Sequence, residues 1–186
     1  MIRHLKNKAK SALARFVRDE TANATVEFAI LFPAFITILL SSVELGMYTV
    51  RHTMLERGLD MAVRDVRLGT GTMTDDQAGH DELKAAICGY AGLIPDCENN
   101  LKLEMIPLDL RAAVAFPNDF DCVDRSELLN PVRTFINGLE NELMLLQACV
   151  QFDPIFPTTG MGSDFTVDGS GMASMYAASA FVQEPL

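Results

Sequence analysis

The chain has 186 residues, a formal net charge of −10 and 49% hydrophobic residues, which suits one modest domain plus a membrane anchor rather than two full domains. Residues 1–22 hold six basic and two acidic side chains, a net of +4, so residues 23–186 carry −14. An acidic body repels phosphate groups, so nucleic acid is not expected among the partners. A basic head before an acidic body instead indicates a membrane topology.

The first 50 residues predict a leader and a transmembrane helix. Residues 1–22 are polar and basic, and residues 24–50 form an apolar run long enough to span a bilayer as a helix. The basic residues precede the run, so we expect residues 1–22 in the cytoplasm, a transmembrane helix over 23–50, and 51–186 exported. A secretory signal peptide is the competing interpretation, but the run is too long and Val43–Gly46 is a poor cleavage site. Glu44, near the outer interface, is expected to be solvated.

The helical pattern continues beyond the apolar run. Leu55, Leu59, Ala62 and Val66 share one face at helical spacing, and glycines follow at 69 and 71, which predicts a helix end there. We therefore expect one helix from 23 to 68, of roughly 45 residues, with 51–68 outside the membrane. The apolar stripe either packs on the domain core or faces a partner helix.

The remaining elements predict a small α+β domain. A capping-box pattern at 74–77 introduces a helix to about residue 90, and a second helix is expected from 126 to about 142. Alternation predicts a strand over 101–108, which 110–117 extend or re-enter. Residues 143–152 and the last segment, from 175, also suggest strands, and 157–171 form a loop. The predicted fold class is α+β, with a long N-terminal transmembrane helix and helices packed on a roughly three-stranded antiparallel sheet.

The four cysteines are disulfide candidates. No CxxC pair occurs and no histidine stands at zinc spacing from a cysteine. They are either disulfides of an oxidising compartment or buried thiols, and the membrane segment favours disulfides. Of the three possible pairings, we prefer Cys88–Cys97 with Cys122–Cys149.

No enzymatic motif is present, so no catalytic residue, metal or cofactor is predicted. The sequence lacks HExxH, GxSxG, P-loop and GxGxxG patterns. Asp119, Asp121 and Asp124 have spacing that suits a divalent cation, but they lack the glycine and final glutamate of an EF-hand loop. A solvated polar loop is the preferred interpretation.

Two residues stand out inside the apolar run. Glu27 lies near its start, next to Phe28. A carboxylate within lipid is costly unless it is paired or close to the headgroups, so Glu27 is either interfacial or functional. Pro33 removes one backbone donor and predicts a kink or a loosened turn.

The stretch ANATVEFAILFPAF, at 22–35, resembles type IV pilin-like proteins, most closely the TadE/TadF-type minor pseudopilins of the tight-adherence (Flp) pilus system. In that family a prepilin peptidase cuts after a small residue, usually Gly, and a Glu followed by an aromatic stands five residues into the mature chain. The resemblance covers roughly residues 18–68. It implies cleavage between Ala22 and Asn23, with Glu27 and Phe28 as the matching pair. Ala22 stands where Gly is usual.

The resemblance implies a minor pseudopilin of the bacterial inner membrane, with a periplasmic C-terminal domain. Its expected partners are membrane lipid, the prepilin peptidase, and other pilin subunits and assembly proteins. Glu27 and Pro33 are the residues expected to pack between subunits, and Glu27 would neutralise the amine of a neighbouring subunit's Asn23 and set the stagger between subunits. The alternative is an uncleaved bitopic anchor that presents a periplasmic protein-binding module. Cleavage of the leader separates the two.

Overall fold

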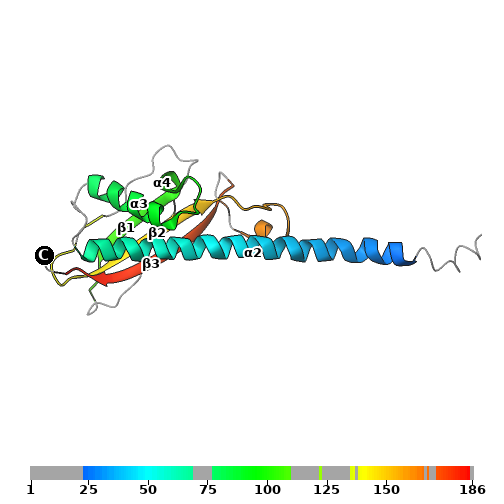
Figure 1. The fold of residues 1–186 in the computed structure, drawn as a ribbon, viewed down its shortest axis with the longest axis horizontal. Coiled ribbons are helices and arrows are strands. Elements are labelled where there is room, and N and C mark those ends of the chain that lie inside the picture. Colours follow the sequence, from blue (N-terminus) through cyan, green and yellow to red (C-terminus); the bar gives the residue numbers. More distant parts are fainter. Residues whose placement is uncertain are drawn as a thin grey trace, which may run out of the picture.

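The computed structural model describes residues 23–68, 77–109, 122, 135–136, 138–165, 167 and 171–184. In this part of the chain, one long helix carries a small α+β head along its C-terminal half (Figure 1). The expected leader at 1–22, the start of the capping box at 74–76, the segment 110–117 and the acidic residues Asp119, Asp121 and Asp124 lie outside the described residues.

The long helix, α2 (Asn23–Arg67), has 45 residues, a length of about 68 Å at 1.5 Å per residue. The predicted single helix is therefore confirmed. Its predicted apolar stripe is buried, with Leu55 and Ala62 fully inaccessible to solvent. The stripe packs on the core of the head, and so it is not a face left open for a partner helix.

Three antiparallel strands form the sheet, as predicted. The structure adds their order, β1-β2-β3. They are β1 (Leu101–Pro107), β2 (Leu143–Phe152) and β3 (Ala173–Val182). Ala148 lies at the centre of the register, opposite Leu103 on β1 and Ala177 on β3. The central strand β2 is buried along most of its length, which explains why its sequence is a nearly continuous apolar run.

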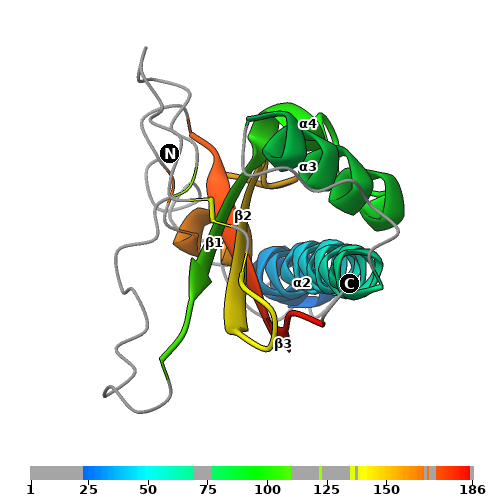
Figure 2. The same cartoon turned by 90° about the vertical axis from the view of Figure 1, so that its left-hand side faces the viewer.

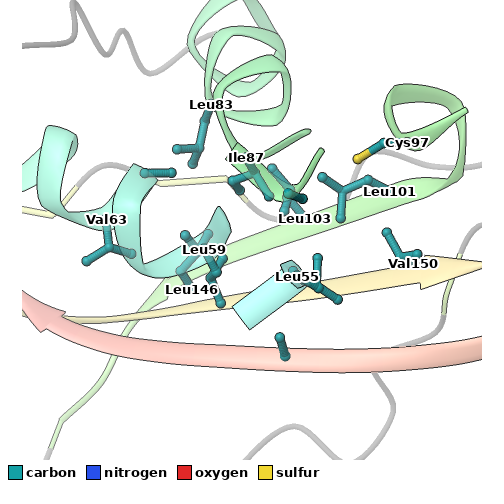
Figure 3. Close-up of a cluster of buried hydrophobic side chains, with 14 of the residues drawn as sticks. Leu55, Leu59, Val63, Leu83, Ile87, Cys97, Leu101, Leu103, Leu146 and Val150 are labelled. Carbon is teal, nitrogen blue, oxygen red and sulfur yellow. The ribbon is translucent and has the colours of Figure 1, made fainter. Parts of the chain in front are cut away.

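The helices cover one face of this sheet. The view along α2 places α2, α3 (Gln77–Ala91) and α4 (Cys97–Asn100) on the same side of the three strands (Figure 2). Between the helices and the sheet, Leu59 of α2, Ile87 of α3 and Leu146 of β2 meet in one apolar cluster (Figure 3). The C-terminal half of α2 is thus part of the core of the head.

One predicted helix is wrong over the residues that the structure describes. The expected helix from 126 to about 142 is absent at 135–136 and 138–142. Phe135 instead forms an isolated bridge with Met105 of β1. Asn141 takes a left-handed conformation with φ 61°, and the carboxylate of Glu142 accepts the backbone N–H of Leu139 at 2.8 Å. These residues turn the chain into β2, and a left-handed residue ends any helical path. In the expected loop at 157–171, the chain forms a short 3-10 helix, η2 (Gly160–Asp164).

Candidate functional site

The N-terminal part of α2 projects beyond the head (Figure 1). Its large apolar side chains are exposed: Val26, Phe28, Ile30, Leu31, Phe32, Phe35, Ile38 and Leu39. The helix is long and apolar enough to cross a membrane, and none of its most apolar segment is buried within the protein. A core helix of a soluble protein would be covered by its own chain, so this exposure fits a lipid-facing segment.

Glu27 lies on this projecting segment, one helical turn from the first described residue, Asn23. Its side chain is exposed, and no ion pair joins it to another of the described residues. Phe28 beside it is 62% exposed and stacks on Phe32, with ring centroids 4.9 Å apart. The structure therefore presents Glu27 and Phe28 outward, while Ala22 lies outside the described residues.

Of the two effects expected of Pro33, a kink or a loosened turn, the kink is absent. The helix α2 passes through it without interruption and runs straight in Figure 1. The carbonyl oxygen of Pro33 accepts a hydrogen bond from the Thr37 hydroxyl at 2.8 Å. One missing backbone donor removes a single hydrogen bond, and in a helix of 45 residues that loss has not bent the axis.

Glu44 is the main departure from expectation within α2. It is only 1% exposed, whereas the sequence predicted a solvated side chain. Its carboxylate accepts backbone N–H hydrogen bonds from Ile155 at 3.1 Å and Phe156 at 2.9 Å. A buried carboxylate needs such donors to offset its loss of hydration. The segment after β2 supplies them, which is why this charge is tolerated inside the protein.

Ser41 makes the next contact along the same helix. The Ser41 hydroxyl accepts the backbone N–H of Met161 at 3.2 Å and donates to the carbonyl of Thr37 at 2.8 Å. Gly160 takes a left-handed φ of 58°, and a Cβ there would collide with the Ser41 hydroxyl. We call the contacts of Ser41 and Glu44 with residues 155–161 the Glu44 latch.

Further along α2, Arg51 ties the end of β2 to the helix. Its guanidinium donates to the carbonyl of Asp153 at 3.3 Å and lies 5.7 Å from the ring centroid of Phe152. Tyr48 packs against both Phe152 and Phe165. Contacts with the head therefore begin near Ser41, before the boundary at residue 50 that the sequence suggested. That boundary stays a prediction, but the packing moves the candidate lipid-facing segment toward the N-terminus.

The preferred disulfide pairing is confirmed. Cys88 near the end of α3 is bonded to Cys97 at the start of α4, and Cys122 is bonded to Cys149 of β2. The Cα–Cα distances are 5.7 Å and 5.2 Å, within the range of ordinary disulfides. No group of three or more His, Cys, Asp or Glu side chains suited to a metal ion occurs among the described residues.

Sequence reasoning missed the Glu44 latch. The available signal was a carboxylate with two serines, Ser41 and Ser42, in an otherwise apolar run. Such polar residues inside an apolar helix indicate a buried polar contact. The loop partners of Glu44 and Ser41 lie more than 110 positions away, so local pattern alone does not identify them.

Over the residues that the structure describes, these features define a helix-first α+β protein with one candidate membrane-spanning helix, which carries the exposed Glu27 carboxylate near its start. Residues 23–64 match the family model described as TadE-like protein. The resemblance to TadE-like proteins is thereby confirmed over this segment, and the family suggests a role in assembly of the tight-adherence (Flp) pilus. The match lies within α2 and does not reach the sheet. No curated protein and no solved structure matched the chain.

Proposed function

We propose that this chain is a minor pseudopilin that takes part in assembly of a tight-adherence pilus and acts as a structural subunit rather than an enzyme. The observation that carries the proposal is the TadE-like match over 23–64, which begins at the expected first mature residue, Asn23. The exposed apolar surface of α2 supports it, because a subunit that moves between lipid and other helices needs such a surface. The protein would reside in the inner membrane with its head in the periplasm.

Glu27 has a defined role in this proposal. Cleavage after Ala22 would create a free amine at Asn23, about 6 Å along the helix axis from Glu27. Each charge is costly in a low dielectric, and an ion pair between subunits offsets part of that cost. The outward position of Glu27 leaves its carboxylate available to a neighbouring subunit. The pair would also fix the axial stagger of the two helices.

The first test is the N-terminal sequence and intact mass of the full chain from membranes, with and without a prepilin peptidase. The proposal expects a chain that starts at Asn23 only when the peptidase is present. Ala22→Gly restores the residue usual in the family and should increase the cleaved fraction. Ala24→Gly, two residues beyond the bond, is the matched control and should leave cleavage unchanged.

The second test concerns Glu27 directly. Glu27→Val should prevent incorporation into the pilus machine while leaving the protein folded and in the membrane, and Glu27→Asp should restore part of it. Glu56→Val is a matched control because Glu56 lies exposed on the same helix, within the head region. Normal incorporation of Glu27→Val would refute the role assigned to this carboxylate.

The presence of Ala22 where the family usually has Gly favours one alternative, in which the leader is not cleaved and the protein is a bitopic anchor whose head binds another envelope protein. The same mass measurement decides between the two. A full-length parent chain in the presence of an active peptidase, together with cleavage of the Ala22→Gly variant, would support the anchor. It would also show that Ala22 is the reason why the parent chain is not cleaved.

A further inference from the structure

The loop between β2 and β3 has an unusual composition where it meets α2. Residues 154–163 contain no charged side chain, and Asp153 and Asp164 flank them. Within this loop, Ile155 is 41% exposed, Phe156 and Met161 are partly exposed, and Pro157 is exposed. An uncharged loop with apolar side chains on its surface is not what an aqueous environment alone favours.

The Glu44 latch fixes the position of this loop along α2. Met161 is held by Ser41, and a Cβ at Gly160 would lie 3.4 Å from the carbonyl oxygen of Thr37. The loop therefore reaches the level of Thr37 to Glu44. Ser41 lies about 27 Å along the helix from Asn23, and the hydrocarbon core of a bilayer is about 30 Å thick. If α2 enters the membrane near Asn23, the loop lies at the outer edge of the lipid.

The backbone donors of the loop suit that location. Glu44 accepts the N–H groups of Ile155 and Phe156, Ser41 accepts that of Met161, and the carbonyl of Phe156 accepts that of Thr159 at 3.2 Å. Unsatisfied backbone groups are costly where water is scarce. Three backbone donors of the loop are thus occupied by α2 and a fourth by the loop itself, which lowers the cost of contact with the interface.

We infer that residues 154–161 rest in the outer interfacial layer of the membrane, with Ile155 in contact with lipid. At the same level of α2, Val43 and Leu45 are 45% and 48% exposed. The head then sits directly on the bilayer in a fixed orientation, since Glu44 and Ser41 hold the loop to the spanning helix. This inference requires α2 to cross the membrane but does not depend on pilus assembly.

The chain contains no tryptophan, so a single introduced tryptophan reports its own surroundings. The full-length Ile155→Trp protein is reconstituted in phosphatidylcholine vesicles with and without bromine on the acyl chains. Val182→Trp is the matched control: Val182 is 43% exposed against 41% for Ile155. It lies at the far end of β3, two residues from Glu184, which pairs with Arg67. Arg67 is about 39 Å along the helix from Ser41.

We expect Ile155→Trp emission to shift to shorter wavelength and to lose most of its intensity in brominated vesicles, while Val182→Trp keeps a water-like spectrum and its full intensity. Equal, unquenched spectra from the two variants would overturn the inference and would point to a protein partner for the loop. If Ile155→Trp does not fold, as judged by circular dichroism, Thr158→Trp in the same loop takes its place.

Alkaline extraction of the same vesicles separates this inference from the proposed function. Protein that washes out of the membrane would overturn the interfacial placement, because the placement requires a spanning α2. A chain that stays in the membrane, is quenched at residue 155 and is never cleaved would retain the interfacial loop while refuting the pseudopilin proposal.

Discussion

The carboxylate of Glu44, inside a helix that the sequence predicts to be in lipid, accepts the backbone N–H of Phe156 at 2.9 Å across 112 positions of the chain. The second carboxylate oxygen accepts the backbone N–H of Ile155 at 3.1 Å, and Glu44 is only 1% exposed. The helix is therefore joined to the head by a charged acceptor at its midpoint. The head cannot pivot there without breaking both hydrogen bonds.

We expect Glu44→Gln to lower the free energy of unfolding by about 1–3 kcal/mol, because a neutral amide replaces a charged acceptor and offers one oxygen for two donors. Hydrogen exchange at Ile155 and Phe156 should accelerate. The control is Glu56→Gln on the same helix, whose exposed carboxylate lies 3.6 Å from His52 and should change stability by about 0.5 kcal/mol or less. Equal effects of the two substitutions would contradict the role of Glu44.

Gly58 lies where α2 packs tightly against α3. A Cβ at this position would lie 2.7 Å from the carbonyl oxygen of Ile87 and 3.2 Å from the Cβ of Ala91. Ala normally stabilises a helix by about 1 kcal/mol relative to Gly. Here we expect Gly58→Ala to destabilise by about 1–3 kcal/mol, because the methyl group forces the helices apart.

The matched control for this prediction is Gly89→Ala in α3. No atom lies within 4 Å of a Cβ built at Gly89, so the helix propensity should dominate and the variant should be slightly more stable than the parent. Thermal unfolding followed by circular dichroism distinguishes the two. A Gly58→Ala protein more stable than the parent would contradict the prediction, because it would show that α3 moves away from α2 without loss of stability.

The disulfides offer a test of compartment as well as of stability. Cys97 and Cys149 are 8% and 0% exposed, and each is bonded to its partner. Protein prepared from the cell envelope should show no thiol that reacts with an alkylating agent after denaturation, and four after reduction. Labelling without reduction would place the head in a reducing compartment.

Replacing Cys88 and Cys97 together with Ser should lower the free energy of unfolding by about 2–4 kcal/mol.

Tyr90 and Asp65 predict a change in stability at high pH. The Tyr90 phenol donates to the Asp65 carboxylate at 2.7 Å; this hydrogen bond, followed by the charge of Asp65, raises the pKa of Tyr90 above 10.0. The folded protein thus holds this proton to higher pH than the unfolded chain. The contribution of the contact is complete below pH 10 and is lost as pH rises through the raised pKa.

The phenolate absorbance of the folded protein tests this relationship. Asp65→Asn removes the negative charge and should return the titration of Tyr90 toward its ordinary pKa. Tyr90→Phe should abolish the corresponding part of the loss of stability above pH 10. Asp60→Asn is the control, because Asp60 contacts Ser179 at 3.4 Å. Identical titration curves for the parent and Asp65→Asn would disprove the assignment.

Much of the fold could be predicted from periodicity. The apolar run and the stripe through Leu55 and Val66 led to a helix that the structure places at Asn23–Arg67, and the apolar run at 143–152 coincides with β2. The expected helix near 126–142 was wrong where the structure describes it. The residues before β2 have weak periodicity, and the contact of Phe135 with Met105 is not local.

The sequence alone determined the long helix, the three strands and the likeness of roughly residues 18–68 to TadE-like proteins, because each depends on side chains that are close together along the chain. Only the tertiary structure decided that Glu44 is buried and that Ser41 already belongs to the head. A carboxylate in an apolar run has the same local signature whether it meets water, lipid or protein. The N–H groups that hydrogen-bond to the Glu44 carboxylate belong to Ile155 and Phe156. Folding brings them to the helix from more than 110 positions away, a separation that no local pattern records.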